Sequence, residues 1–460
     1  DTSFSKYSFI NDSNIEQDIK FLIHSELLSD QNNFISGMKL DNGMVQFAHD
    51  FSIATFSKLE KIFAGQINGT SNNIGSGIIG GKDYVGMSKD SGISFDIGKL
   101  PAGHRKDIEI CIYIDENKKT MHDFMDEVER IRKIDFNKEL NDTKAYWRKY
   151  VKEHDGLKIK EPQNSYEEKI LNVYKRSILL FPLLMNEETG GIIASPEVDE
   201  ELSQCGRYAY CWPRDAVFIT QALDILKMNK EADKFYSEFC RITQSKNGMW
   251  EQRFYTDGRL APCWGYQVDE TASVVYGVYN HYEYTKNEEF LKENLHMCEL
   301  AITFLKKYVY DVLENTGKYS VSYDIWEEND RGIHMYSLAS IFSAFDTMKK
   351  IYKALGKNVS DFENNRLKEE KINKNIKEID ELMLKVKEYI EQNLYDENRK
   401  SYVRNTEDRR IDISLLGAVY PFNVFSPKEK KVLNTVENIN LTLRTYTGGY
   451  QRYESFRSEE

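Results

Sequence analysis

Residues 207–216 read Arg-Tyr-Ala-Tyr-Cys-Trp-Pro-Arg-Asp-Ala, and they predict the start of a helix. Proline fits the first turn of a helix, and apolar spacing follows Pro213 over residues 215–228. Loops that carry Trp, Arg or Asp precede further helices at 250–270 and 322–332. Because such loops join one helix pair to the next, we expect helical hairpins closed into a toroid, with the loops gathered at one end.

The helical spacing extends from residue 165 to the end of the chain. It predicts helices over 166–185, 215–228, 231–243, 271–284, 287–308, 334–355, 363–394, 411–418 and 427–436. The 363–394 segment is very rich in Lys and Glu, which is typical of a solvated helical face.

The first 115 residues have the pattern of strands instead. Segments 93–97 and 108–114 are alternating or continuously apolar, with a turn at 101–103 between them, and 75–81 is a second, glycine-rich turn. Segment 14–28 fits a helix or a strand equally well. We expect a β-sandwich-like domain over 1–117, wholly or partly formed, a helical linker over 118–160 and a helical domain over 161–460.

Composition narrows the function classes. The 460 residues carry a net charge of −12, which argues against binding to nucleic acid or an anionic membrane. No apolar run approaches the roughly 20 residues of a membrane span. The six cysteines form no CxxC pair and are expected to be buried, reduced thiols. No phosphate-loop, dinucleotide or nucleophile-elbow motif occurs, so we expect no cofactor and no metal.

The first loop has the residues of a sugar site. Arg214 and Asp215 would point off the rim of their helix, where fork donors and carboxylate oxygens match vicinal hydroxyls. Tyr208 and Trp212 would supply flat faces for a pyranose ring. A surface ion pair with aromatic packing is the alternative.

The second and third loops extend this pattern. Trp264 is either an exposed stacking platform or a buried corner, and Asp269 is a candidate helix cap. In the third loop, Asp324, Glu327 and Glu328 crowd around Trp326, which would raise a carboxyl pKa toward that of a general acid. The alternative is an acidic helix N-terminus. Together, the three loops favour a neutral carbohydrate site.

Five motifs resemble bacterial members of glycoside hydrolase family 15: the glucoamylases, glucodextranases and related α-glucosidases. They are Tyr-Cys-Trp-Pro-Arg-Asp-Ala (210–216), Trp-Gly-Tyr-Gln-Val-Asp-Glu (264–270), Asp-Ile-Trp-Glu-Glu (324–328), Asp-Ile-Ser-Leu-Leu-Gly (412–417) and Gly-Gly-Tyr-Gln-Arg-Tyr-Glu (448–454). The resemblance covers roughly residues 165–460. It implies a β-sandwich domain, a helical linker and an (α/α)6 barrel with the active site at one end.

The resemblance also implies roles. Glu327 would be the general acid, with Glu328 and Asp324 shaping its pKa and holding sugar hydroxyls. Arg214 and Asp215 would bind the terminal glucose, which makes the enzyme exo-acting. The other substrate-binding residues would be Tyr208 near the scissile bond, Trp264 and Arg452 on the leaving-group side, and the aromatic side chains of Trp212 and Trp326.

One element of the family is not found in the sequence. Inversion needs a second carboxylate about 6.5–9.5 Å from the acid, and in the family it follows the segment that aligns with Arg452-Tyr453-Glu454. The chain stops at Glu460, and Glu459 and Glu460 lie too close to that motif to substitute. Nine or ten of twelve barrel helices are expected (roughly, by spacing), so we expect that both ends are truncated.

The sequence therefore predicts an inverting exo-α-glucosidase that releases β-glucose from the non-reducing ends of α-glucans or of malto- and isomalto-oligosaccharides. The alternatives are a trehalase of the same family, a non-catalytic glucan-binding protein without a base, and a structural or regulatory domain. The expected partner is the glucan or oligosaccharide itself, with no nucleic acid or membrane. No charged-then-apolar leader follows Asp1, and the predicted location is cytoplasmic.

Overall fold

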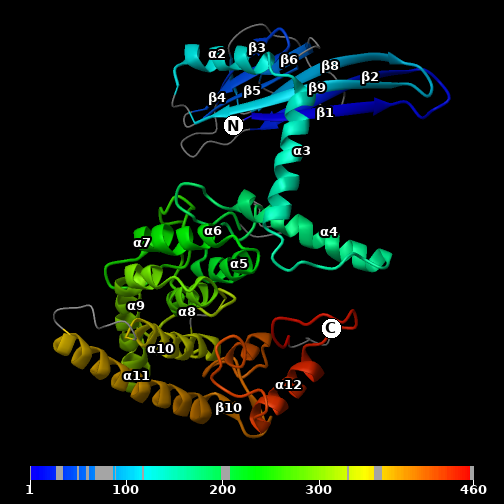
Figure 1. Cartoon of the computed structure of the whole chain (residues 1–460). Coiled ribbons are helices and arrows are strands. Elements are labelled where there is room, and N and C mark those ends of the chain that lie inside the picture. Colours follow the sequence, from blue (N-terminus) through cyan, green and yellow to red (C-terminus); the bar gives the residue numbers. More distant parts are fainter. Residues whose placement is uncertain are drawn as a thin grey trace. The chain divides into compact units, whose positions relative to one another are not determined.

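The computed structural model describes residues 2–26, 35–48, 51–57, 62–67, 86–88, 90–116, 119–197, 208–328, 331–356 and 365–455. The chain divides into two compact units, residues 1–148 and 149–460, whose elements are labelled in Figure 1. The predicted turn at 75–81 lies outside the described residues.

The first unit contains two antiparallel sheets. The larger has the order β1 (Thr2–Ile10), β9 (Arg105–Asp115), β5 (Ser52–Ser57), β4 (Gly43–Phe47), β3 (Ile35–Leu40) and β7 (Gly86–Ser88). The smaller has the order β2 (Gln17–Glu26), β8 (Asp90–Leu100) and β6 (Ile62–Ile67). The ambiguous segment 14–28 is thus a strand over residues 17–26. The turn at 101–103 joins β8 to β9, so it connects the two sheets.

Because successive side chains of β9 point to opposite faces, this strand contributes to two apolar cores. Ile108 and Ile110 pack into a core shared with Phe95 of β8 in the smaller sheet. Tyr113 faces the opposite way and stacks on Phe124 of α2 (Met121–Arg132). Successive side chains of a strand point to opposite faces, so β9 is covered on both sides. The predicted strand organisation of this region is confirmed.

The predicted linker region is helical. Thr120 begins α2 with a capping box, because its hydroxyl accepts from the Asp123 backbone and the Asp123 carboxylate reaches back. The next helix, α3 (Phe136–Glu153), crosses the boundary between the two units. The predicted limits of the linker, 118 and 160, stay a prediction.

The second unit is built from helices, and all but one of the helices predicted after residue 165 are present over their described residues. They are α4 (Ser165–Leu180), α5 (Pro213–Ile225), α6 (Asn229–Lys234), α7 (Cys240–Thr243), α8 (Val268–Thr285), α9 (Glu288–Glu314), α10 (Met335–Gly356), α11 (Asn365–Asn393) and α12 (Lys430–Thr442). Short 3₁₀ turns follow α4 (η1, Phe181–Leu184) and precede α12 (η4, Ile413–Ala418), and a π-turn (η2, Phe235–Phe239) joins α6 to α7. Two-residue strands β10 (Tyr395–Asp396) and β11 (Ser401–Tyr402) pair after α11. The segment expected to be a helix over 411–418 is therefore a 3₁₀ turn.

Helices α5, α8 and α10 pack side by side, and η4 packs against α10. Helix α9 packs against α8 and α10, and α11 packs against α10, so these helices and α5 form two layers. One large apolar core lies between these layers. Contacts between Arg214 at the start of α5 and Asp269 at the start of α8 show that both helices begin at the same end.

The described cysteines follow the sequence analysis in part. Cys111, Cys211, Cys240 and Cys298 are buried free thiols, as predicted, whereas Cys263 is partly exposed. Cys205 lies outside the described residues. Within the described ranges, we find no helix with the length and apolar character needed to cross a bilayer.

Candidate active site

Four charged residues at the starts of α5 and α8 form what we call the Arg214 cluster: Arg214, Asp215, Asp269 and Glu270. The Arg214 guanidinium lies 2.9 Å from Asp269 Oδ2, 3.0 Å from Glu270 Oε1 and 3.2 Å from Asp215 Oδ2. Asp269 and Glu270 are completely buried, and the Asp215 side chain is 43% exposed. Only Asp215 of the three carboxylates is therefore open to a ligand.

The Arg214 cluster bears on two sequence-based expectations, the orientation of Arg214 and the role of Asp269 as a helix cap. Arg214 does not point off the rim but is buried among the carboxylates, and its backbone N–H donates to Glu270 Oε2 at 2.5 Å. Asp269 is not the helix cap, because Gln267 occupies that position and Asp269 pairs with Arg214. Burial raises the pKa of Glu270 well above its ordinary value against the opposing charge of Arg214. Protonation of Glu270 would relieve the excess of three carboxylates over one guanidinium.

Glu327 faces the Arg214 cluster. Its carboxylate accepts a hydrogen bond from the Trp212 indole N–H, across 115 residues of sequence. Burial raises the pKa of Glu327, while the charge of Arg214 and the Trp212 hydrogen bond oppose the rise. The backbone of Glu327 has φ of 62°, a left-handed conformation that costs a non-glycine residue about 1–2 kcal/mol. Surrounding contacts must therefore hold this residue in place.

Aromatic side chains surround Glu327. Trp264 is 51% exposed and Tyr208 is exposed, so both offer open faces, and Trp264 is not a buried corner. Trp212 is buried, and it acts as a hydrogen-bond donor to Glu327 more than as an open platform. The guanidinium of Arg253 lies 4.5 Å from the Trp264 ring centroid and 5.3 Å from that of Trp212. Arg253, which the sequence analysis missed, thus packs between the two indoles.

Glu328 points into a different group of residues from Glu327. Its carboxylate accepts from Arg452 Nη1 at 3.2 Å and from the Tyr453 hydroxyl. The Arg452 guanidinium also lies 5.1 Å from the Trp326 ring centroid. The structure therefore brings the predicted Arg452 to the predicted Glu-Glu pair, although 124 residues separate Arg452 from Glu328 in sequence.

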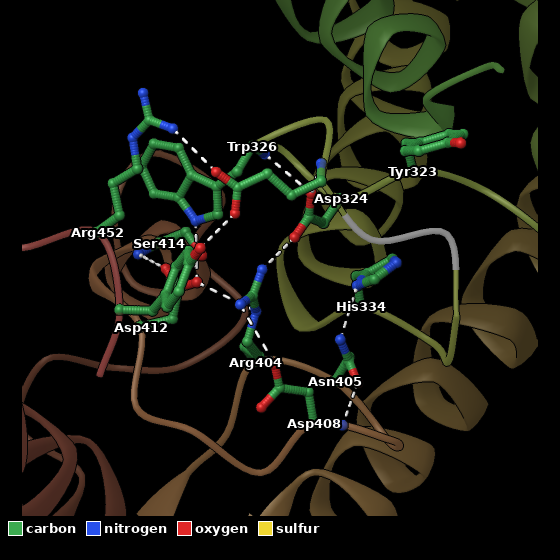
Figure 2. Close-up of polar contacts among 12 residues, drawn as sticks. Tyr323, Asp324, Trp326, His334, Arg404, Asn405, Asp408, Asp412, Ser414 and Arg452 are labelled. Carbon is green, nitrogen blue, oxygen red and sulfur yellow. Dashed lines mark hydrogen bonds and ion pairs between the residues drawn. The ribbon is translucent and has the colours of Figure 1, made fainter. Parts of the chain in front are cut away.

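Figure 2 shows a second charged group beside this pair, which we call the Arg404 cluster: Arg404, Asp324, Asp408 and Asp412. Arg404 forms a buried ion pair with Asp324 and lies 3.3 Å from Asp408 Oδ2 and 3.5 Å from Asp412 Oδ2. Asp324 Oδ1 accepts from the backbone N–H groups of Trp326 and Glu328 at 3.2 and 3.0 Å. Both oxygens of Asp324 are thus engaged by protein donors, which differs from the sugar-holding role that the resemblance implies.

Trp326 and His334 are also held by neighbouring segments. The indole N–H of Trp326 donates to Asp412 Oδ2 at 2.9 Å (Figure 2). The buried His334 lies 3.1 Å from the Ser322 carbonyl and 3.3 Å from the Asn405 amide, so it is a satisfied core histidine. Asp412 belongs to a motif that the sequence analysis quoted without a role. Arg404 stands in no such motif, and its sequence neighbours gave no signal.

Glu454 and Glu251 are two further carboxylates of the loop segments. Glu454 is bound by Arg399, with Nη1 at 2.9 Å, and it accepts the Ile411 backbone N–H at 2.8 Å. Glu251, in the second loop, is half-buried, and burial raises its pKa. Glu459, Glu460, Asp330 and Arg207 lie outside the described residues. Within the described ranges, no group of three or more His, Cys, Asp or Glu could hold a metal ion.

Comparison with solved structures bears on the fold. A structure titled "Glycosidase Wild Type" has a TM-score of 0.50 and 16% sequence identity, covering 64% of this chain and 75% of that chain. A variant of a glycosidase in complex with glucose matches with the same TM-score, identity and coverage. At this identity the likeness concerns the fold, which is that of the helical glycosidases.

Comparison of sequences gives the family. The family described as "Glycosyl hydrolases family 15" matches residues 168–458, and the chain belongs to this family. It is 27% identical to an uncharacterized glycosyl hydrolase (MJ1610) of Methanocaldococcus jannaschii over 81% of this chain and 55% of that protein. It is 25% identical to a trehalase of Mycolicibacterium smegmatis over 35% of this chain and 25% of that protein. The chain thus spans about half the length of the first of these relatives and a quarter of the second.

Proposed function

We propose that this protein is an exo-acting, inverting α-glucosidase that releases β-glucose from the non-reducing ends of α-glucans or oligosaccharides. The observation that carries the proposal is the position of Glu327. Its carboxyl has a raised pKa, accepts from the Trp212 indole and faces the Arg214 cluster. A carboxyl that holds its proton toward neutral pH next to a set of hydroxyl-binding groups can protonate a glycosidic oxygen.

The Arg214 cluster supplies the sugar-binding side. Asp215 keeps an exposed carboxylate, whereas Arg214, Asp269 and Glu270 are buried behind it. A hydroxyl pair can donate to Asp215 while the buried groups fix the orientation of that carboxylate. Because protein fills the space behind Asp215, this end suits a terminal sugar, which supports exo-action.

The chemical step would use Glu327 as general acid. Protonation of the glycosidic oxygen lets the bond to the anomeric carbon break with oxocarbenium character. Water then attacks from the opposite face, and a second carboxylate must remove its proton. We assign none of the described carboxylates to that role, because Glu454 is bound by Arg399 and Glu328 by Arg452 and Tyr453.

The proposal leaves the glycosidic linkage open: the substrate can be an α-1,4-linked glucan, an α-1,6-linked glucan or trehalose. Trehalose enters because a relative is named as a trehalase, and its two glucose units would present the same terminal hydroxyls to Asp215. A glucan-binding protein without turnover is the remaining alternative, since it needs the Arg214 cluster and the exposed Trp264 but no base.

A proton NMR time course would test the proposal. The full chain is mixed with maltotriose, isomaltose and trehalose, and the anomeric signals are followed. Early β-glucose from one of them would support the inverting exo-α-glucosidase and identify its linkage. Early α-glucose would contradict inversion. Sugar binding without any glucose release would favour the binding protein, and the Glu327→Gln variant serves as the blank for contaminating glycosidases.

A further inference from the structure

Arg404 joins its own segment of the chain to two segments that are far from it in sequence, around Asp324 and around Tyr453. Its side chain is 3% exposed and contacts Asp324 before α10, Asp408 in the following turn and Asp412 at the start of η4. Its guanidinium also lies 4.2 Å from the ring centroid of Tyr453. A planar guanidinium with five donors can serve several acceptors and a ring at once.

Three of these partners, Asp324, Asp412 and Tyr453, hold a neighbour of Glu327. Asp324 accepts the backbone N–H groups of Trp326 and Glu328. Asp412 accepts the Trp326 indole N–H, and the Tyr453 hydroxyl donates to Glu328. The residues on both sides of Glu327 are therefore fixed by groups that Arg404 contacts, and the contacts to Asp324 and Asp412 can be followed in Figure 2.

Glu327 itself has few restraints of its own. Its backbone N–H donates to the Asp324 carbonyl at 3.0 Å, and its carboxylate reaches Trp212 on the far side. Its left-handed backbone, with φ of 62°, is kept only if both neighbours are held. We propose that Arg404 is a positioning residue that orients Glu327 toward the Arg214 cluster through Asp324, Asp412 and Tyr453. Its catalytic consequence rests on the proposed function, whereas the structural coupling does not.

The test replaces Arg404 with lysine. Lysine keeps the positive charge but cannot bridge Asp324 and Asp412 or stack flat on Tyr453. Arg410→Lys is the matched control, because Arg410 also packs on Tyr453, at 4.5 Å, and pairs with Asp408 at 2.6 Å. Among the contacts of the described residues, Arg410 has none to Asp324 or Asp412.

The readout is ¹⁹F NMR of the full chain labelled with 5-fluorotryptophan, without substrate. The resonances of Trp326 and Trp212 are assigned with Trp→Phe variants. We expect Arg404→Lys to shift or broaden both resonances, and Arg410→Lys to change neither. An unchanged Trp212 resonance in a folded Arg404→Lys protein would overturn the proposal, because Trp212 reports the Glu327 carboxylate.

A second variant, Asp412→Asn, tests the proposal if the Arg404→Lys protein does not fold. Asp412→Asn removes one anionic partner of Arg404 without leaving a buried cation unpaired, since Asp324 and Asp408 remain. It should move the Trp326 and Trp212 resonances in the same way, and unfolding of both variants would show a purely structural role and overturn the proposal. In an active protein, we expect Arg404→Lys to lower kcat about 10- to 100-fold with little change in KM. A wild-type chain without turnover would refute the proposed function and leave the ¹⁹F test standing.

Discussion

The two arginine clusters contain the same groups in different surroundings. Arg214 and Arg404 are each buried and each contact three carboxylates. In the Arg214 cluster, one carboxylate, Asp215, is 43% exposed, whereas the most exposed carboxylate of the Arg404 cluster, Asp408, is 16% exposed. The first cluster can therefore exchange water for a ligand, and the second can only hold protein.

Both clusters contain more acidic than basic side chains. In both, neighbouring groups or raised carboxyl pKa values act against this excess of negative charge. Burial raises the pKa of Glu270 in the first cluster and that of Asp412 in the second. Arg410 provides a further cation for Asp408. Removing one partner from a buried ion pair is costly, although the intact pair gives little net stability. The comparison teaches that the same chemistry serves binding or positioning according to its access to solvent.

Glu327 faces the Arg214 cluster, whereas the Glu328 backbone is bound by Asp324 of the Arg404 cluster. Substitutions in this pair have the largest expected effect. Glu327→Gln should lower kcat about 10²- to 10⁴-fold, because an amide cannot protonate the leaving oxygen. Glu328→Gln should cost less, since Glu328 is bound by Arg452 and Tyr453 and transfers no proton in this scheme. Glucose release and sugar binding are measured for both variants. Equal losses of kcat in the two variants, or unchanged turnover in Glu327→Gln, would contradict the assignment of Glu327 as the general acid.

Asp215→Asn and Asp408→Asn test the two clusters directly. At Asp215 we expect a loss of glucose affinity of about 10-fold or more, measured by calorimetry, because an acceptor for sugar hydroxyls loses its charge. At Asp408 we expect unchanged affinity and a loss of about 1–2 kcal/mol in the free energy of unfolding. If the Asp408 variant loses affinity while the Asp215 variant loses only stability, the assignment of the clusters is reversed.

The two tryptophans that donate to carboxylates should differ in their effect on pH dependence. Activity requires protonated Glu327, so it falls as the pH rises through the pKa of this group. The Trp212 hydrogen bond favours the carboxylate and lowers that pKa. Trp212→Phe should therefore move the alkaline limb of kcat/KM to higher pH. Trp326→Phe removes a donor to Asp412, so a comparable shift in its profile would contradict this distinction.

Glu270 gives the smallest expected effect, and it appears in stability. Its pKa is raised in the folded protein, so its contribution is fully present below the unfolded pKa and is lost as the pH rises through the folded pKa. Glu270→Gln stays neutral and should remove that loss, with a change below about 1 kcal/mol at pH 5. Urea unfolding across pH measures both proteins. A wild-type stability that rises with pH by the same amount as in the variant would exclude a neutral Glu270.

Much of the fold could be predicted from local pattern. Helical spacing after residue 165 located α4 to α12, and alternation in 93–97 and 108–114 located β8 and β9. Pattern could not show that β8 and β9 lie in different sheets, because the same alternation fits either arrangement. It also predicted a helix over 411–418 where the structure has a 3₁₀ turn, capped by Asp412.

The candidate site could also be predicted only in part. The residue types at 210–216, 264–270 and 324–328 were enough to predict a carbohydrate site, and the family match over 168–458 agrees with that interpretation. The choice of Glu327 within the third loop came from the family resemblance. Burial of Arg214 could not be foreseen, since its partners Asp269 and Glu270 belong to a separate helix.

The sequence by itself determined the helices, the strands and the chemical types in the loops, because these depend on neighbours within a few residues. The tertiary structure decided which carboxylates are open and which are held. Arg404 reaches Asp324 across 80 residues, and Arg452 reaches Glu328 across 124. Such pairs exist only because the helices begin at one end and bring their loops together, and no local periodicity encodes that meeting.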